Sequence, residues 1–415
     1  MLKVLSLNSF SVVVSFVLGI FSSKIISVFL GTSGMALMGS FKNFSGMLKS
    51  VATLGISNAV VKLFVENKED KEELSIIYST FFWLFLGIAT LLCVGVVLTA
   101  PMLSNFLFYS NQYATPLRFF GLFLPLMVIN SFWLAIYNGL EKYKSIILIQ
   151  VISNVVLFGT TAFLIVENNI EGGLLSVAVG ECLMVGVTFV FVRKDKQYFQ
   201  FQLQKILNVK YLKIIQKFGF MALLSAVVVP ATLMIIRNTI VKYYTIEEAG
   251  LWDAINRLSG FYMMFFSSGL SLYYMPKLAS IHTESEFKNE LKEYYKIFVP
   301  LFLVMLVVLY LAKSMILKVA FTEEFSKIND LLIWQLMGDF FRIMTLAFGF
   351  QVLVKTMMKR YFLIEMIFNG TYLFLALYLL PTFGIKGALQ AYCGANILSF
   401  LVILLMFRKL FSTKN

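Results

Sequence analysis

Charged residues lie deep inside the long apolar segments of this sequence. An ionised side chain near the centre of a bilayer costs about 2.5 to 3.5 kcal/mol on insertion scales, so those that persist usually face protein, water or a substrate path. We therefore treat them as the residues most able to carry chemistry. They are Lys24, Lys42, Lys49, Lys62, Arg237, Arg257, Arg342, Glu181, Asp253, Asp339 and Glu365.

Three of the cations stand apart from acidic residues along the sequence. Lys24, Lys42 and Arg237 have no Asp or Glu three or four positions away, where a helix would place a neighbour on the same face. A cation in a low-dielectric site forms strong, charge-assisted hydrogen bonds to phosphate or carboxylate groups. We expect Lys24, Lys42, Arg237 and Arg257 to bind the anionic head of a substrate.

Two acid–base pairs occur at helical spacing. Asp253 and Arg257 are four positions apart, and Asp339 and Arg342 are three apart, so each pair can meet on one helix face. Each pair either neutralises itself or takes part in gating. Gln335, one turn before Asp339, belongs to the same group.

Two further features concern the shape of the helices. Pro230 lies two turns before Arg237 and removes a backbone hydrogen bond, which predicts either a static kink or a hinge. In the second apolar segment, small and polar residues recur with the helical period and predict a face that lines a cavity. This stripe consists of Lys42, Ser45, Gly46, Lys49 and Thr53.

The composition indicates a chain dissolved in lipid. Of its 415 residues, 59% are hydrophobic and only 14% are charged, and the mean hydropathy is +0.84. The net charge of +13 comes without a soluble basic face, so nucleic acid is not an expected partner. Cys93, Cys182, Cys393 and the single His282 lack metal-ligand spacing, and we expect neither a metal nor another cofactor.

Turn signals and charge clusters divide the chain into about twelve transmembrane helices, so the predicted fold is an all-α integral membrane protein. The first six are predicted at 4–30, 35–64, 74–100, 114–140, 145–166 and 172–192. The second six are predicted at 214–243, 247–275, 294–320, 327–356, 361–380 and 385–407.

Basic residues in the connections predict the orientation. Placing both termini in the cytoplasm puts most loop Lys and Arg on the cytoplasmic side, as the positive-inside rule requires. We expect 1–192 to form one six-helix lobe, 193–213 a cytoplasmic linker and 214–415 a second lobe. The basic linker is either an ordinary positive-inside loop or a segment that lies on the anionic leaflet.

The two lobes resemble one another in sequence. At a nearly constant offset, 42–46 (KNFSG) aligns with 256–260 (NRLSG), Gly55 with Gly269, and Lys24 with Arg237. An even number of helices per unit makes the repeats parallel, as in one class of transporters. Two such bundles can rock around a central cavity, which is the physical basis of alternating access.

Several motifs resemble Wzx-type O-antigen and enterobacterial-common-antigen flippases, of the polysaccharide transporter family in the MOP exporter superfamily. They are 217–223 (KFGFMAL), Pro230, Arg237, 248–252 (EAGLW), 273–278 (YYMPKL), 334–339 (WQLMGD), 348–349 (FG), Lys355, 360–361 (RY) and Glu365. The resemblance spans essentially the whole chain and is looser in the first half, where Lys24, Gly34 and Gly55 carry it.

This resemblance implies a monomeric protein of the bacterial inner membrane that moves an undecaprenyl-pyrophosphate-linked oligosaccharide from the cytoplasmic to the periplasmic leaflet. Membrane lipids would surround it, and a polysaccharide polymerase and a chain-length regulator are candidate partners. Basic residues would hold the pyrophosphate, and polar groups such as Asn43, Asn256 and Gln335 would face the sugars.

Two other functions are open. A multidrug or cation antiporter of the same superfamily would share the duplicated architecture, but cation export calls for carboxylates deep in the first or seventh helix, where this chain has Lys24 and Arg237. A membrane enzyme of polysaccharide assembly is less favoured, because the loops are short and contain no cluster of catalytic acids, bases or metal ligands.

Overall fold

The computed structural model describes residues 2–55, 57–196, 199, 201, 203–204 and 208–410, and within these ranges the regular structure is entirely helical. The α-helices are α1 (Leu2–Phe29), α2 (Gly31–Ala52), α3 (Ser57–Glu66), α4 (Lys71–Leu98), α5 (Ala100–Phe108), α6 (Ala114–Gly139), α7 (Tyr143–Lys194), α8 (Val209–Tyr243), α9 (Ile246–Ser280), α10 (Glu284–Leu311), α11 (Lys313–Ala320), α12 (Ile328–Val354) and α13 (Met358–Met406). Short 3-10 helices are η1 (Asn111–Tyr113), η3 (Glu323–Phe325) and η4 (Arg408–Leu410). The predicted all-α fold is confirmed.

The helices also confirm the predicted number of spans. Eight helices in the described ranges are long and apolar enough to cross a membrane. Two of them, α7 and α13, each contain two helices joined at a kink. The more polar α2, continued by α3, and the 35-residue α9 supply the remaining two of about twelve spans.

The kinks of α7 and α13 occupy equivalent places in the two halves. Asn169 has φ 50° and ψ −129°, and Gly384 has φ 60° and ψ −144°. The chain therefore reverses in both helices at a residue in a sparsely populated backbone region. Glycine adopts such a conformation without a steric penalty, and asparagine tolerates it better than most residues do. The two kinks divide α7 and α13 where the sequence predicts separate helices.

The second predicted helix is not continuous. Leu54 and Gly55 have φ values of 50° and 60°, and this left-handed turn separates α2 from α3. The expectation of one helix over 35–64 is therefore wrong, because these two residues leave the helical region. In the second half, α9 runs without a break through Gly269, the residue aligned with Gly55.

The order of elements repeats along the chain. In both halves a long helix (α4 or α10) is followed by a short one (α5 or α11), a 3-10 turn, a second long helix (α6 or α12) and a kinked pair (α7 or α13). The long helices begin with comparable caps. The Asp70 carboxylate accepts hydrogen bonds from two backbone N–H groups of α4, and Thr283 forms a capping box with Glu286 on α10. The predicted six-helix repeat is thus visible in the helix pattern.

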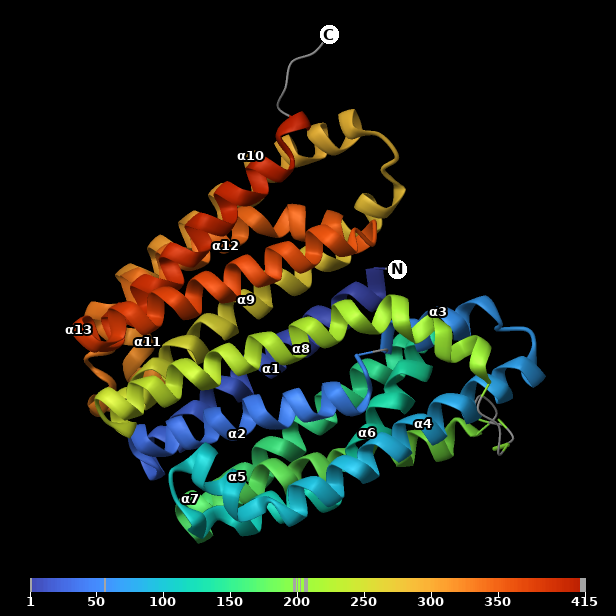
Figure 1. Ribbon diagram of the computed structural model, residues 1–415, viewed down its shortest axis with the longest axis horizontal. Helices are drawn as coiled ribbons and strands as arrows, with labels where there is room; N and C mark the ends of the chain where they lie inside the picture. Colours follow the sequence, from blue (N-terminus) through green and yellow to red (C-terminus); the bar gives the residue numbers. More distant parts are fainter. Residues whose placement is uncertain are drawn as a thin grey trace. The chain divides into compact units, whose positions relative to one another are not determined.

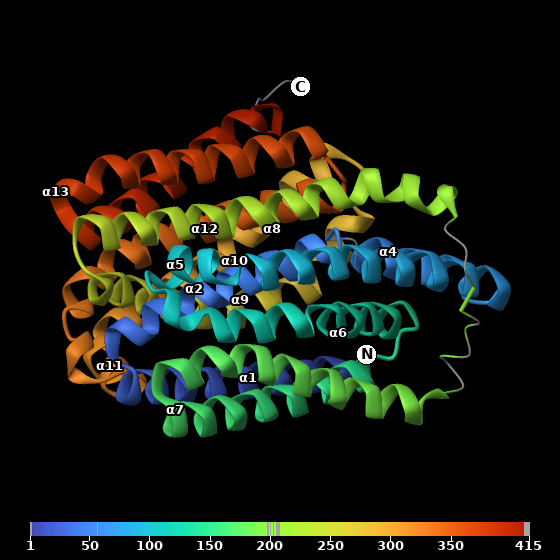
Figure 2. The ribbon, with the colours of Figure 1, turned by 60° about the horizontal axis from the view of Figure 1, so that its bottom comes forward.

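The chain divides into two compact units, here called the N-terminal unit (Met1–Leu30 and Leu37–Pro230) and the C-terminal unit (Gly31–Ala36 and Ala231–Asn415). In the N-terminal unit α1 packs on α7 and α4 packs on α6; Figure 2 shows α7 folding back beside α1. In the C-terminal unit α12 packs on α9, α10 and α13, and Figure 1 shows α12 and α13 side by side. The boundary lies within α8, at Pro230.

The start of α2 belongs to the C-terminal unit through a close backbone contact. A Cβ added to Gly250 on α9 would lie 1.8 Å from the carbonyl oxygen of Thr32, so a larger side chain cannot fit without moving one helix. This contact explains the glycine in the 248–252 segment.

Part of the predicted linker packs on α4. The Trp83 indole N–H donates to the Gln204 carbonyl, and the Gln204 N–H donates to the Ser79 hydroxyl, each over 2.9 Å. Residues 197, 198, 200, 202 and 205–207 of the linker lie outside the described residues. The side chains of 217–222, which belong to the first family-like motif, also lie outside them.

Candidate functional site

Four helices of the C-terminal unit bring buried polar residues together. Arg237 lies on α8, and Asp253 and Arg257 lie on α9. Asp339 lies on α12, and Tyr392 lies on the second arm of α13. Because α12 contacts both α9 and α13, it connects these side chains into one polar interior within an otherwise apolar bundle.

Arg237 and Asp253 form a buried ion pair. The Arg237 Nε donates to Oδ2 of Asp253 and its Nη2 donates to Oδ1, each over 2.6 Å, in the bidentate geometry that suits guanidinium and carboxylate. The two side chains are 1% and 9% exposed. Arg237 also lies over the Trp252 ring, 5.6 Å from its centroid. The pair ties α8 to α9.

Arg257 is the second cation near Asp253, and it forms no ion pair within 4.0 Å among the described residues. Its Nη1 approaches the Met35 sulfur at 3.9 Å, and its Nε is buried with no hydrogen-bond partner in the described structure. The Nη1 atom of Arg237 is in the same situation. Two guanidinium groups therefore lie on α8 and α9 near one carboxylate, and only Arg237 pairs with it.

Asp339 accepts hydrogen bonds from four side chains. Ser259 and Tyr392 donate from hydroxyls at 2.6 and 2.7 Å, Gln335 donates from Nε2 at 3.3 Å, and the Tyr262 hydroxyl completes the set. Asp339 is 0% exposed. Its carboxylate is thus stabilised by neutral donors from three helices, which is one of the few ways to bury a charge without an opposite one.

Comparisons with known proteins agree with this architecture. The model of a family described as polysaccharide biosynthesis protein matches residues 2–282. The chain belongs to this family. The Lipid III flippase of Escherichia coli (strain K12) is 24% identical to this member over 393 residues, which cover 92% of each chain.

Two solved structures show the fold that this family member shares. Lipid II flippase MurJ, in an inward closed conformation, superposes with a TM-score of 0.79 at 16% identity and covers 96% of this chain and 87% of that one. An inward-facing multidrug resistance MATE transporter of the MOP superfamily superposes with a TM-score of 0.76 at 15% identity and covers 96% of each chain.

In the N-terminal unit of this family member, the charged residues lie nearer the surface. Lys24 on α1 is half-buried, and Lys42 on α2 is exposed. Lys49 and Glu181 form an ion pair between α2 and α7, with side chains 25% and 19% exposed. The hydroxyls of Ser45 and Thr53 instead donate to carbonyls of their own helix, so these two members of the predicted polar stripe are buried in helix packing.

The structure changes both expected acid–base pairs of this family member. Asp253 pairs with Arg237 on the neighbouring helix, and its separation from Arg257 exceeds ion-pair distance. Asp339 accepts from hydroxyls and an amide, and no ion pair joins it to Arg342 among the described residues; Arg342 is exposed. Spacing along one helix therefore gave the wrong partners, because neighbouring helices offered better geometry.

Other predicted residues occupy different settings. Gln335 is buried beside Asp339, and the Asn256 amide donates to the carbonyl of Trp252 over 2.9 Å. The helix α8 continues through Pro230, and whether this position bends during function stays a prediction. Among the residues that the structure describes, no three metal-ligating side chains cluster.

Sequence reasoning missed the tyrosines that bind Asp339. Tyr262 and Tyr392 cannot be singled out from the sequence, because aromatic residues are abundant in membrane helices and carry no spacing signal. Glu181 was recognised as an intramembrane charge, but its partner Lys49 is far away in sequence. The sequence shows only that an acidic and a basic residue lie in different predicted helices of the first half. Many other acid–base pairs of the chain meet the same condition.

Proposed function

We propose that this protein is a flippase that moves a lipid-linked oligosaccharide across the bacterial inner membrane, from the cytoplasmic to the periplasmic leaflet. One observation carries the proposal: the chain resembles the Lipid III flippase of Escherichia coli over 92% of both lengths. The fold shared with lipid II flippase MurJ supports it. These relatives carry the names of transporters, which favours transport over an enzymatic role.

The charges suit an anionic lipid head. A pyrophosphate group offers several oxygens to charge-assisted hydrogen bonds, and guanidinium and ammonium groups are their usual protein partners. We assign direct contact to Lys24, Lys42 and Arg257, and we assign Arg237 first to the positioning of α8 on α9. Asp253, Asp339, Gln335 and Arg342 then belong to helix pairing or gating, and Pro230 to a hinge.

The membrane potential favours this direction of transport. Moving one negative charge outward across an inside-negative membrane gains about 2.3 kcal/mol per 100 mV. We further propose that both termini are cytoplasmic, since this orientation places most of the loop Lys and Arg on the cytoplasmic side. The protein works as a monomer in this scheme, next to the polymerase and chain-length regulator that use its product.

The decisive experiment is flipping of a defined undecaprenyl-pyrophosphate-linked oligosaccharide in liposomes that contain the purified protein. We expect Lys24→Ala and Lys42→Ala to insert normally and to lose at least about tenfold in rate, because each removes a cation from the anion path. Lys62→Ala is the matched control, since Lys62 is 54% exposed and pairs with Glu66 one turn away. Wild-type rates in both variants would refute the anion assignment.

A cation antiporter is the second candidate, favoured by the buried carboxylate of Asp339 and by the MATE fold. The same liposomes can be loaded with a cationic dye under a proton or sodium gradient. We expect no gradient-driven dye movement. Dye export without oligosaccharide flipping would replace the flippase proposal with the antiporter.

A further inference from the structure

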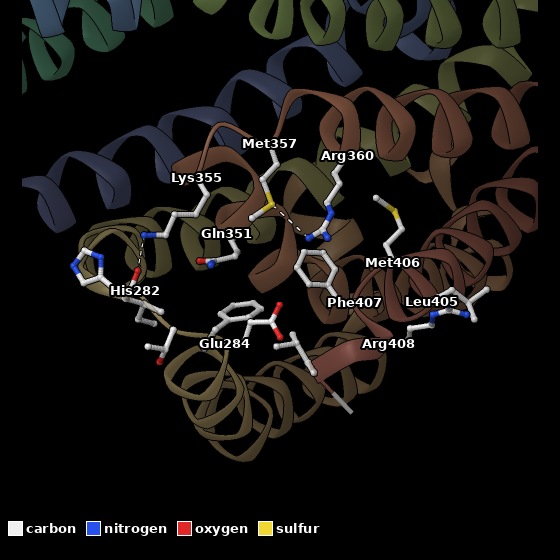
Figure 3. Close-up of a pocket in the computed structure, with 14 residues that line it drawn as sticks. His282, Glu284, Gln351, Lys355, Met357, Arg360, Leu405, Met406, Phe407 and Arg408 are labelled. Atoms are coloured by element: carbon white, nitrogen blue, oxygen red, sulfur yellow. Dashed lines mark hydrogen bonds between the residues drawn. The ribbon is translucent and has the colours of Figure 1, made fainter. Parts of the chain in front are cut away.

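A cavity of about 400 Å³ opens at one end of the C-terminal unit, where three chain segments meet. They are the α9–α10 connection at 281–283, the α12–α13 connection at 355–357 and the end of α13 with η4 (Figure 3). This volume lies within the usual range for small-molecule sites. None of the residues discussed above as the candidate functional site lines it.

Three cations line the cavity: Lys355, Arg360 and Arg408. The Lys355 ammonium donates to the carbonyls of Ala279 and Ile281, at 3.2 and 2.5 Å. Arg360 stacks on the Phe407 ring, 4.6 Å from its centroid, and Arg408 is exposed. No carboxylate of the described chain lies within ion-pair distance of these three side chains.

Hydrogen-bond acceptors lie beside the cations. Gln351 is 7% exposed, and its Oε1 atom is buried without a hydrogen-bond partner in the described structure. Figure 3 shows Gln351 between Lys355 and Phe407, and Glu284 also lines the cavity. A buried acceptor without a donor is costly, so rotation of the Gln351 amide that brings Oε1 to a ligand hydroxyl in the cavity would be favourable. The lining therefore matches a phosphate group attached to a hydroxylated carbon chain.

The surroundings indicate that the ligand is a lipid. The cavity lies where apolar helices end, and Leu405 beside it is 68% exposed on the outer face of α13. Met406 and Phe407 continue this apolar wall into the cavity. A headgroup in the cavity can thus remain attached to acyl chains that lie along α13, in the bilayer. A soluble phosphate compound would gain nothing from this wall.

We propose that this cavity is a binding site for the headgroup of an anionic, hydroxyl-bearing phospholipid of the phosphatidylglycerol type. The phosphate accepts hydrogen bonds from Arg360 and Lys355, and a glycerol hydroxyl donates to Oε1 of Gln351. The site anchors the end of the C-terminal unit to the lipid leaflet and does not depend on the proposed transport function. The same chemistry occurs in the head of a lipid-linked oligosaccharide, so the experiment must separate the two lipids.

Native mass spectrometry of the detergent-purified protein with added lipids tests the site. We expect retention of phosphatidylglycerol over phosphatidylethanolamine of equal chain length, and a loss of about tenfold in Arg360→Ala. Gln351→Leu keeps the volume and removes the acceptor, so it should reduce the preference with less effect on total lipid. Lys359→Ala, which removes an exposed neighbouring charge outside the cavity lining, is the matched control. Equal retention of both lipids by all variants would overturn the proposal.

A second measurement separates the lipid sources and guards against misfolding. Arg360→Lys keeps the positive charge but loses the planar group that stacks on Phe407, and we expect it to retain part of the lipid preference. In liposomes, Arg360→Ala should still flip lipid-linked oligosaccharide when these liposomes contain phosphatidylglycerol. Displacement of phosphatidylglycerol by the oligosaccharide lipid, together with lost flipping in Arg360→Ala, would instead assign the cavity to the substrate.

Discussion

The two halves of the chain share a helix pattern but hold their intramembrane charges differently. In the C-terminal unit, Arg237 and Asp253 are almost fully enclosed, with side chains 1% and 9% exposed. In the N-terminal unit, the Lys49 and Glu181 side chains are 25% and 19% exposed, and Lys42 is exposed. Lys24 and Arg237 therefore occupy equivalent places in sequence but not equivalent surroundings.

This difference separates structural charge from charge that a substrate can reach. An enclosed ion pair has already lost its water, and removing one member leaves an uncompensated charge in a low-dielectric interior. A partly exposed cation keeps solvent access and can exchange water for an anionic ligand. We infer that the C-terminal unit uses the enclosed Arg237–Asp253 pair mainly to hold α8 on α9, whereas Lys42 and the Lys49–Glu181 pair of the N-terminal unit stay in reach of solvent.

The largest predicted effect comes from breaking the enclosed ion pair of the C-terminal unit, and the partly exposed pair of the N-terminal unit serves as the comparison. Asp253→Ala should lower the free energy of unfolding by about 3 to 5 kcal/mol, because Arg237 stays buried without its carboxylate. Glu181→Ala should cost about 1 kcal/mol or less, since solvent can reach Lys49. Thermal unfolding in detergent measures both. Equal losses would contradict the distinction between the two units.

The kinks allow a test in which the two halves should respond alike. Gly172 follows the α7 kink and Gly387 follows the α13 kink, and a Cβ would lie 1.8 Å from the Leu164 oxygen or 2.6 Å from the Leu379 oxygen. Each alanine substitution should therefore destabilise the protein by about 1 to 3 kcal/mol, with Gly172→Ala the worse of the two. Gly159→Ala, with no atom within 4 Å of its Cβ, is the control. A harmless Gly387→Ala would show that the second kink is not a packed repeat of the first.

Helix existence could be predicted from sequence because lipid permits only long apolar helices here, and their lengths follow from the thickness of the bilayer. The break at Leu54 and Gly55 could not be predicted from sequence. The aligned residue in the second half, Gly269, lies in a continuous helix. Glycine allows a left-handed turn without requiring one. Only packing in the folded bundle decides between the two outcomes.

The candidate site was predictable in its residues but not in its contacts. Arg237, Asp253, Arg257 and Asp339 were recognisable because charge is rare and costly in a membrane segment. Their partners lie on other helices, and a single sequence gives no information on which helices touch. The tyrosine hydroxyls that donate to Asp339 could not be predicted either, because tyrosine is common in membrane proteins.

Asp339 gives a small predicted effect on stability and the sharpest contrast between the halves. The offset that superposes the two kinks places it opposite Leu124, an enclosed apolar residue of α6. In Asp339→Asn the side chain keeps its size, and the Gln335 amide, whose Oε1 has no partner in the described structure, can turn to accept from the new N–H group. We expect a loss of about 1 kcal/mol, comparable to one hydrogen bond.

The functional readout of Asp339→Asn decides what the buried carboxylate is for. Transport should be measured per amount of protein across a range of external pH, with Leu124→Ala as a packing control. If Asp339 only stabilises the helix bundle, the rate should follow protein level and keep the wild-type pH dependence. A pH dependence that vanishes at normal protein level would instead make Asp339 a titrating group in transport. Because the first half has Leu124 at the equivalent position, coupling of transport to this titration would then belong to the C-terminal unit.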